Sequence, residues 1–546
     1  MNKLKIIYKK GKEFFLPFLS GVLLFLAYPP QNLWFLVFAA LIPLFWFLFS
    51  EKTSLKRAFW GGSITGFVFM SGLFIWLFHT APFEWLGVNS EKSFVLVLIL
   101  MIILWCFQVF LLGISFGAFC WFLKKFIKTA SGIFTFLIVV PFSWAVFEYL
   151  RAWWFEFIWL GKETFFGPHW TFGALAYALH NVPLFLQSAD LWGIYGIGFI
   201  IALINVSLFL ILDSGRQKIL KKQIIALVLI IFIAFSFLFI YGKLKMKINF
   251  DGEKREIALM QTNFLSDANF NAYHKEEICK LLTAMFQQPG IKDKNPDFII
   301  APEGLGIVSC YGNNLKIAQS QLKDFWKSGQ IYLESRKTLD ENGKIKSRLF
   351  YYDLEKDNPV AYYEKRLLVA NGDFLPYVTK LLLNVYSFAS GFEKRLYQKG
   401  EIDFPATTPK GIIGGTICSS ILSPEINRQM TGRGAEILMV VSSDAPFHGS
   451  KPLLTQNLAM SKLRAIENRR YFVQSTNMGY AFLLNPKGEI VLKSQKFGNE
   501  IQFANVKLLN QKTFYVRFGD WFVLLAFAVL LTGLAYPRVL TFLKIK

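Results

Sequence analysis

The sequence has few of the residues that bind transition metals. Its 546 residues include only five cysteines and five histidines. The histidines are scattered, and no cysteines form a Cys-x-x-Cys pair or a Cys/His pair with the spacing of a metal site. This pattern argues against a zinc site.

Acidic residues are also scarce. There are 37 Asp and Glu against 59 Lys and Arg, which gives a formal net charge of +22. Such an excess could indicate nucleic-acid binding, but many basic residues lie in short loops between apolar segments, as membrane topology predicts. The chain is 54% hydrophobic and 17% aromatic, more apolar than an average soluble domain. We interpret it as a membrane protein with one polar domain and no nucleic-acid partner.

Long apolar runs are what the sequence does have. A span needs about 20 apolar residues, and the candidates are residues 13–28, 32–50, 58–79, 93–123, 131–150, 190–212, 223–242 and 519–537. Five lysines between Lys3 and Lys12 precede the first run, as in a signal peptide. The run ends in Tyr28-Pro29-Pro30 without a small-residue cleavage site. We therefore expect an uncleaved anchor and about eight spans.

Loop charge predicts the orientation of these spans. With eight spans, the basic N-terminus, residues 52–57, 124–128 and 216–222, and the C-terminal tail all fall on one side. By the positive-inside rule this side is the cytoplasm. The predicted organisation is a seven-span domain (1–245), a polar domain outside the cytoplasm (246–512) and a C-terminal transmembrane helix (513–546).

The loop of residues 151–189 is unusually aromatic. Four tryptophans and four phenylalanines lie between Trp153 and Trp170. Two interpretations remain open: an aromatic belt at the headgroup level, or a re-entrant or interfacial segment that lines a path for lipid. Glu148 and Arg151 lie near a span end, where charged side chains can reach water, so we consider them weaker functional signals than mid-span charges.

The polar domain alternates between short apolar runs and helical patterns. We expect strands within residues 256–260, 297–300, 411–414, 437–441, 471–474 and 481–484, and helices near 271–288, 315–327 and 452–469. Residues 485–488, Asn-Pro-Lys-Gly, predict a hairpin turn. Strands alternating with helices indicate an α/β domain, in which loops at strand ends often carry catalytic residues.

Three such residues stand out. Glu303 follows a strand and Pro302, Lys365 follows a Tyr-rich strand, and Cys418 ends a Gly-rich strand. Singly, each has an ordinary explanation as a turn carboxylate, a surface lysine or a small core residue. Together they supply a base, a cation and a nucleophile for acyl transfer, because the carboxylate can take the thiol proton and the ammonium can stabilise thiolate and oxyanion.

The other cysteines bear on this interpretation. Exported cysteines tend to pair, so an unpaired cysteine outside the cytoplasm needs a reason. Cys279 and Cys310 could form a disulfide and leave Cys418 free, but their spacing alone does not show it.

At these residues the chain resembles the apolipoprotein N-acyltransferases, the membrane-bound branch of the nitrilase superfamily. The similar segments extend over nearly the whole chain: Pro302-Glu303; Tyr363 and Lys365 with Leu368-Val369 and Gly372-Asp373; Ile417-Cys418; Arg464 to Arg469; Thr513 to Trp521; and Trp144, Glu148, Leu150 and Arg151 in the membrane part. The resemblance implies an α-β-β-α sandwich inserted before the last of eight spans. It also implies that Glu303, Lys365 and Cys418 are the catalytic base, lysine and nucleophile.

The resemblance further implies supporting or substrate-binding roles for Asp373, Ser419, Ser420, Ser443, Asp444 and Phe447. Several of these positions depart from the family pattern. Ser419-Ser420 replaces Tyr-Glu, Ser443 replaces Asn, Asp373 replaces Glu, and Pro446 replaces Trp. Since supporting residues hold catalytic groups in place, we expect such changes to affect the rate or the choice of acceptor.

The predicted function is therefore acyl transfer in a bacterial inner membrane, with the polar domain on the periplasmic side. The donor would be a phospholipid and the acceptor the lipidated N-terminal cysteine of an apolipoprotein. We expect a monomer without metal or other cofactor. The alternatives are a membrane-tethered nitrilase-like amidase or hydrolase and a divergent, non-catalytic lipoprotein-binding homologue. A transporter is disfavoured because the spans contain few central charges and no obvious inverted repeat.

Overall fold

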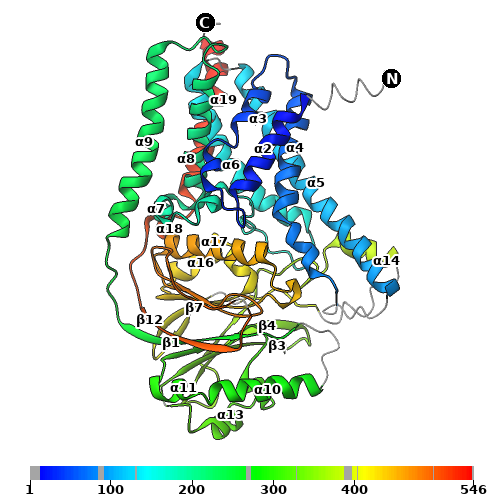
Figure 1. Ribbon diagram of the computed structural model, residues 1–546, viewed down its shortest axis with the longest axis vertical. Coiled ribbons are helices and arrows are strands. Elements are labelled where there is room, and N and C mark those ends of the chain that lie inside the picture. Colours follow the sequence, from blue (N-terminus) through cyan, green and yellow to red (C-terminus); the bar gives the residue numbers. More distant parts are fainter. Residues whose placement is uncertain are drawn as a thin grey trace.

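The computed structural model describes residues 13–83, 91–129, 132–265, 272–327, 329–385, 396–401, 404–495 and 497–543. In it, a helical bundle and an α/β domain are stacked end to end (Figure 1). The predicted basic residues 3–12, and the lysines at 544 and 546 in the tail, lie outside the described residues.

Apolar helices occupy all eight predicted membrane segments. They are α2 (Phe15–Ala27), η1 (Trp34–Phe38) with α3 (Ile42–Leu48), α4 (Leu55–Leu73) with η2 (Ile75–Thr80), α5 (Glu91–Thr129), α6 (Ile133–Ile158), α8 (Ala189–Leu212), α9 (Lys221–Met246) and α19 (Trp521–Leu543). Among the described residues, five segments are long and apolar enough to cross a membrane, and those of α2, η1–α3 and α19 are shorter. The prediction of a polytopic helical membrane domain is confirmed.

The second predicted span is not one continuous helix. The prediction placed a single segment at residues 32–50, but the structure has the short 3-10 helix η1 followed by the seven-residue helix α3. Pro43 lies in the first turn of α3. Since proline lacks an N–H and its ring would clash with the carbonyl of residue 39 in a continuous helix, the helix begins anew there.

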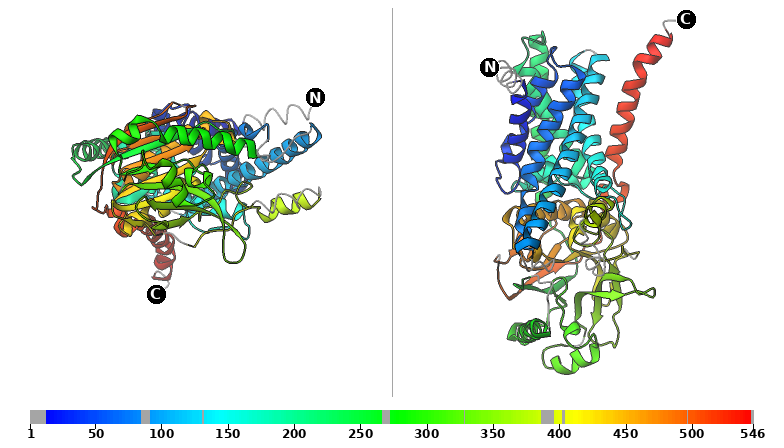
Figure 2. Two further views of the ribbon diagram at one scale, coloured as in Figure 1. Left: turned by 90° about the horizontal axis from the view of Figure 1, so that it is seen from below. Right: turned by 90° about the vertical axis from the view of Figure 1, so that its right-hand side faces the viewer.

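Helix α5 is longer than a bilayer is thick. Its 39 residues extend about 58 Å at 1.5 Å per residue, against a hydrocarbon core of about 30 Å. Figure 1 shows it leaning away from the bundle and reaching the level of the α/β domain. This agrees with the long apolar run in the sequence. At another edge of the bundle, α19 stands apart from the other helices (Figure 2).

Helix α6 corrects the expectation for Glu148 and Arg151. It continues to Ile158, eight residues beyond the predicted end, so both side chains lie inside the bundle, 1% and 3% exposed. The Glu148 carboxylate accepts hydrogen bonds from Trp144 Nε1 (2.9 Å) and from the backbone N–H of Leu175 (2.8 Å). These partners replace water, so the prediction that the two charges reach solvent is wrong.

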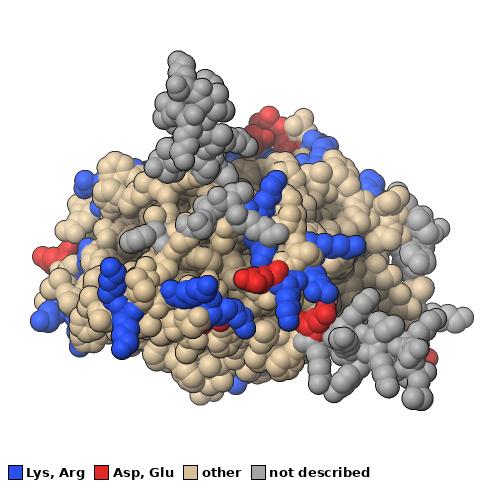
Figure 3. Space-filling view, turned by 90° about the horizontal axis from the view of Figure 1, so that it is seen from above, with Lys and Arg blue, Asp and Glu red and all other residues tan. Residues whose placement is uncertain are grey.

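The basic loops lie together at one end of the bundle. The segments around Arg57, Lys125 and Arg216 are at the end that faces away from the α/β domain, where Figure 3 shows clustered lysines and arginines. Which side of the membrane this end faces stays a prediction.

Among the described residues, twelve strands form the α/β domain. They are β1 (Lys254–Thr262), β2 (Phe298–Ile300), β3 (Ile331–Leu339), β4 (Ile345–Asp353), β5 (Ala361–Glu364), β6 (Ala406–Thr408), β7 (Gly411–Ile417), β8 (Ile437–Ser443), β9 (Phe472–Asn477), β10 (Phe482–Leu484), β11 (Ile490–Lys493) and β12 (Glu500–Lys507). One half has the order β5-β4-β3-β2-β1-β12 and the other β6-β7-β8-β9-β10-β11. The halves join where Gln261 and Thr262 of β1 pair with β9.

The two halves pack as a sandwich. Ile257 and Leu259 of β1 point into the core shared with the second half, while Ala258 and Met260 face the outer helices. These outer helices are α10 (Ala272–Phe286), α11 (Pro289–Lys294) and α13 (Leu315–Leu322). Helices α16 (Pro424–Gly432) and α17 (Lys451–Asn468) cover the other face, between the sandwich and the bundle (Figure 1). The predicted α-β-β-α sandwich is confirmed.

The local predictions in this domain mostly hold. All six predicted strands and the three helices are present, although α13 ends at Leu322 rather than at 327. The predicted turn joins β10 to β11, with the N–H of Asn485 donating to the carbonyl of Glu489 (3.0 Å). The β3–β4 hairpin was not predicted, although the dipeptide Asn342-Gly343 between two alternating runs is a hairpin signal.

A buried ionic cluster joins the domain to the bundle. Asp190, at the start of α8, accepts hydrogen bonds from the guanidinium of Arg469 (2.9 and 3.1 Å), which follows α17. Lys245 of α9 lies 2.9 Å from the same carboxylate. Since breaking a buried pair leaves an uncompensated charge, this cluster disfavours separation of the two parts.

The pairing that the sequence left open is present. Cys279 in α10 and Cys310 in α12 (Ile307–Cys310) form a disulfide, and the free cysteines are Cys106, Cys120 and Cys418.

We expect alkylation to distinguish the free cysteines from the disulfide-bonded cysteines. In unreduced protein, iodoacetamide should modify Cys418 but neither Cys279 nor Cys310, and reduction should expose both. Since the disulfide links residues 31 apart, Cys279→Ser should lower the free energy of unfolding by about 2–4 kcal/mol. Peptide mass spectrometry and denaturation test these statements, with Cys106→Ser as the control. Equal labelling of Cys279 before and after reduction would contradict the pairing.

Candidate active site

Three strand ends bring Glu303, Lys365 and Cys418 together. Glu303 follows β2, Lys365 follows β5, and Cys418 follows β7. Lys365 Nζ lies 3.3 Å from Glu303 Oε1, and the Cys418 thiol is hydrogen-bonded to the Glu303 carboxylate. The structure therefore assembles the base, cation and nucleophile that the sequence suggested into one cluster.

Lys365 lies between two carboxylates. Its Nζ is 2.8 Å from Asp373 Oδ2 and 3.3 Å from Glu303 Oε1, and its side chain is 3% exposed. Asp373 is itself held by the backbone N–H of Val369, which donates to Oδ2 at 2.9 Å. Burial alone would lower the pKa of Lys365, but the two carboxylates raise that pKa well above its ordinary value. The side chain is therefore a fixed positive charge.

As the predicted nucleophile, Cys418 needs a base. Burial and the charge of Glu303 raise the pKa of Cys418 well above its ordinary value, so the resting thiol is protonated. Burial also raises the pKa of Glu303, although Lys365 opposes this shift. Because the thiolate is the reactive form, attack requires transfer of the thiol proton to a neighbouring acceptor. Glu303 is in position to accept it.

The turn after the nucleophile is sharp and well supported. Cys418 has φ +47°, in the left-handed region that non-glycine residues rarely adopt. It begins the 3-10 helix η6 (Cys418–Leu422). The Ser419 hydroxyl donates to the carbonyl of Leu367, and the Asn427 amide donates to the carbonyl of Ser420 (2.9 Å). Strained backbone persists where its surroundings hold it, as these contacts do.

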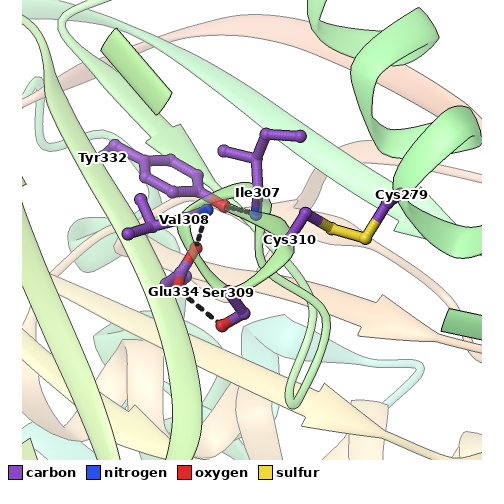
Figure 4. Close-up of a disulfide and its surroundings, with 7 residues drawn as sticks. All are labelled: Cys279, Ile307, Val308, Ser309, Cys310, Tyr332 and Glu334. Carbon is purple, nitrogen blue, oxygen red and sulfur yellow. Dashed lines mark hydrogen bonds between the residues drawn. A yellow bond between two sulfur atoms is a disulfide. The ribbon is translucent and has the colours of Figure 1, made fainter. Parts of the chain in front are cut away.

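The loop after the base is held in the same way. Gly304 has φ +75°, and its N–H donates to Ser335 Oγ (3.0 Å). The buried carboxylate of Glu334 accepts from the backbone N–H of Val308 (2.9 Å) at the start of α12, which the disulfide ties to α10 (Figure 4). Together these contacts fix the path of the chain beyond Glu303.

The two serines that replace the family's Tyr-Glu are packed and partnered. Ser420 is fully buried, and its Oγ lies 3.4 Å from the hydroxyl of Tyr363. Ser419 turns its hydroxyl toward Leu367 rather than toward the cluster. Neither supplies a negative charge, so Asp373 and Glu303 are the carboxylates paired with Lys365.

Asp444 lies beside the cluster at the end of β8. It is 3% exposed, and its Oδ2 accepts from Thr476 Oγ1 (3.2 Å). Burial raises the pKa of Asp444 to about 7; the hydrogen bond from Thr476 opposes this rise, and the charge of Glu303 adds to it. The neighbouring Ser443 contacts Asn477 instead, with Asn477 Nδ2 3.4 Å from Ser443 Oγ.

Phe447 packs toward the bundle rather than against the three central residues. Its ring meets Trp76 of η2 edge to face, with centroids 5.3 Å apart. The following residue, His448, places Nδ1 2.7 Å from the carbonyl oxygen of His79. These contacts dock the loop after Asp444 onto the bundle.

Tyr397 is a residue at the cluster that the sequence did not indicate. Its backbone N–H donates to the carbonyl of Asp373 (2.8 Å). Burial raises the pKa of Tyr397, and the charges of Asp373 and Glu303 add to this rise. Tyr397 lies outside the strands and motifs that the sequence predicts, so the sequence carried no signal for it.

We expect the reactivity of Cys418 to depend on ionised Glu303. The pKa of Glu303 is raised above 4.5. Alkylation of Cys418 by iodoacetamide should therefore increase as the pH rises through this raised pKa. Glu303→Gln should react about 100-fold more slowly at neutral pH, and its rate should rise only as the thiol itself ionises. Mass spectrometry of the Cys418 peptide between pH 4 and 9 measures both. Superimposable profiles for the two proteins would contradict this prediction.

Asp444 should make stability depend on pH. A carboxyl whose folded pKa is raised from 3.8 to about 7 favours the folded state fully below pH 4, and this contribution is lost as pH rises toward 7. Between pH 4 and 8, ionisation of Asp444 should lower the free energy of unfolding by about 2–4 kcal/mol. This decrease should be absent in Asp444→Asn. Burial also raises the pKa of Glu467 to about 7, so Asp444→Asn should keep the pH dependence of stability that Glu467 contributes. The exposed Asp251 provides a control, Asp251→Asn, and denaturation at both pH values is the measurement.

Comparison with known proteins gives matches in both parts of the chain. Residues 20–207 match the apolipoprotein N-acyltransferase N-terminal domain, and residues 314–511, which include Lys365 and Cys418, match carbon-nitrogen hydrolase. The apolipoprotein N-acyltransferase of Geobacter metallireducens is 24% identical over 544 residues, with 96% of both chains covered. That of Bdellovibrio bacteriovorus is 27% identical over 542 residues, covering 94% of this chain and 92% of the relative. A crystal structure of a carbon-nitrogen hydrolase from Helicobacter pylori G27 aligns with 48% of this chain and 92% of its own, at 14% identity and a TM-score of 0.36.

Proposed function

Because this multi-span membrane protein belongs to the apolipoprotein N-acyltransferase family of the nitrilase superfamily, we propose that it acylates apolipoproteins. The donor is a membrane phospholipid, and the acceptor is the α-amine of a lipidated N-terminal cysteine. The observation that carries this proposal is the cluster of Glu303, Lys365 and Cys418 in a domain docked directly onto an apolar helical bundle.

The first half-reaction forms an acyl-enzyme. Glu303 takes the proton of the Cys418 thiol as the sulfur attacks the ester carbonyl of the phospholipid. The negative charge that develops on the carbonyl oxygen is stabilised by the Lys365 ammonium, together with the backbone N–H of Ser419. Collapse breaks the ester C–O bond, and Glu303 returns the proton to the departing oxygen. The products are a thioester on Cys418 and a lysophospholipid.

The second half-reaction transfers the chain. The neutral α-amine of the acceptor attacks the thioester, and Glu303 takes a proton from the attacking nitrogen. The C–S bond breaks, the amide leaves, and Glu303 returns the proton to the sulfur. Each group ends in its starting state, so no metal, nucleotide or redox partner is required. Two successive transfers through one covalent intermediate imply ping-pong kinetics.

The supports around the site suit this use of fixed charges. Lys365 is held between two carboxylates, so its charge is in place before the oxyanion forms and does not need to reorient. The loop after Asp444 packs on Trp76 of the bundle, which brings the margin of the site to the apolar helices. We place the domain on the periplasmic side of a bacterial inner membrane, because the basic loops lie at the opposite end of the bundle.

Water as the acceptor would make the same cluster a hydrolase, and the match to carbon-nitrogen hydrolase favours this as the second candidate. The two differ in what discharges the thioester. A hydrolase releases free fatty acid, whereas an acyltransferase holds its acyl group until an amine arrives.

Replacing Cys418 by alanine should abolish the acyl-enzyme. Purified protein incubated with a phospholipid that carries a fluorescent acyl chain should retain the label on a denaturing gel, and hydroxylamine should remove it. Cys418→Ala should retain less than about 1% of the label, while Cys106→Ser, which alters a free cysteine of α5, should label normally. Labelling that persists in Cys418→Ala would refute the role of this thiol.

Addition of a diacylglyceryl-cysteine peptide should then discharge the label as an N-acylated peptide. Discharge at the same rate in buffer alone, with release of free fatty acid, would favour the hydrolase.

A further inference from the structure

The aromatic loop between α6 and η4 (Leu175–Leu179) contacts the segments that carry the candidate catalytic residues. Within it, residues 160–171, here called the clamp loop, belong to the bundle in sequence. From the sequence, two interpretations of this region remained open: an aromatic belt at the headgroup level, or a segment that lines a path for lipid. Some of its rings are exposed, such as Phe166, but Trp170 and His169 are buried against the protein.

The first contact is with the turn that follows Cys418. Thr171 Oγ1 donates to the carbonyl of Leu422 at 2.9 Å. His169 Nδ1 lies 2.8 Å from Ser423 Oγ. That serine oxygen also accepts the N–H of Ile426 (3.1 Å) as the cap of α16.

The bond between His169 and Ser423 joins two neutral groups. His169 is fully buried, and burial lowers its pKa to about 3, so it is neutral at physiological pH. A neutral ring has one nitrogen that accepts and one that donates. Nδ1 therefore bonds to Ser423 in either tautomer, as acceptor or as donor.

The second contact is with the segment of Lys365. Arg366, the next residue, places its guanidinium over the ring of Phe165, 4.1 Å from the centroid. Phe165 also stacks on His169, with ring centroids 4.4 Å apart. One stack therefore links the residue beside the lysine to the residue that holds the nucleophile's turn.

The third contact is with the segment of Asp373. The carbonyl of Leu160 accepts from the N–H of Tyr377 (2.8 Å). Glu163 accepts from the backbone N–H of Lys399 (2.9 Å), two residues after Tyr397. A single loop thus reaches the chain beside Lys365, beyond Asp373 and beyond Cys418.

We propose that the clamp loop sets the relative positions of the catalytic residues, and that His169 and Thr171 are positioning residues for the Cys418 turn. The inference rests on the function proposed above and deepens it. Cys418 has a backbone conformation that its surroundings must hold, and two of the hydrogen bonds on its turn come from the bundle. The bundle is then part of the catalytic apparatus as well as its anchor.

Two substitutions at one position separate the hydrogen bond from the packing. His169→Phe keeps an aromatic ring against Phe165 but removes the nitrogen that bonds to Ser423, whereas His169→Asn keeps a polar group near the position of Nδ1. Two rates are measured. The first is single-turnover formation of the acyl-enzyme at saturating phospholipid, and the second is alkylation of Cys418 by iodoacetamide in the absence of phospholipid. Phe232→Leu, which alters an exposed ring of α9, is the matched control.

We expect His169→Phe to lower both rates at least tenfold. Its KM for phospholipid and its thermal midpoint should stay close to those of the wild type, because the loss concerns the position of the thiol. His169→Asn should recover to within about threefold of the wild type. The double variant of His169→Phe and Ser423→Ala should be no slower than Ser423→Ala alone, because Ser423→Ala already removes the bond to His169 together with the cap of α16. A merely structural role would move the thermal midpoint and would give no such rescue.

Wild-type rates in His169→Phe, or equal loss in His169→Phe and His169→Asn, would overturn the proposal. If His169→Phe does not fold, Ser423→Ala and Ser423→Thr decide: the proposal requires the first to be slow and the second to be near wild type, and equal rates overturn it. If the wild type forms no acyl-enzyme from phospholipid, the proposed function fails, while the alkylation rates still test the clamp loop.

Discussion

One buried ammonium organises the candidate site. Lys365 neutralises Asp373 at 2.8 Å and Glu303 at 3.3 Å in a region with little solvent. Without that charge, two carboxylates would face each other in a low-dielectric environment, where like charges are costly and at least one would be protonated. With it, Glu303 can remain an acceptor of hydrogen bonds beside a protonated thiol. The charges of Lys365, Asp373 and Glu303 tolerate little displacement. The Val369 amide, which donates to Asp373, and the loops after each strand therefore hold these side chains in place.

The same constraint explains how the two parts of the molecule fit together. The proposed reaction needs a site that is open to the membrane yet rigid, and the sandwich meets the bundle through α16, α17 and the turn that follows Cys418. Asp190 with Arg469 holds one margin of this contact, and Phe447 with Trp76 holds another. The far side of the sandwich is fastened differently, by the disulfide between α10 and α12. Rigidity therefore comes from the bundle on one face and from a covalent bond on the other.

Much of this architecture could be predicted from the sequence, because the signals are local. Long apolar runs gave the membrane segments, alternation gave the strands, and motif resemblance pointed to the central residues. The β3–β4 hairpin and the break at Pro43 had local signals as well, in Asn342-Gly343 and in the proline itself. His169 and Tyr397 had none. Their importance lies in contacts with distant segments, such as that between His169 and Ser423, 254 residues apart, and no periodicity or spacing reports which loops meet across two domains.

The position of residues 160–171 in the chain has a consequence for biosynthesis. They precede every strand of the sandwich, so a ribosome makes them, and the membrane receives them, before the polar domain exists. When β7 and the turn after it emerge, His169 and Thr171 have already been synthesised. The earlier half of the polypeptide can thus serve as a template on which the later half matures, and an incomplete chain would lack a formed nucleophile until the two halves dock.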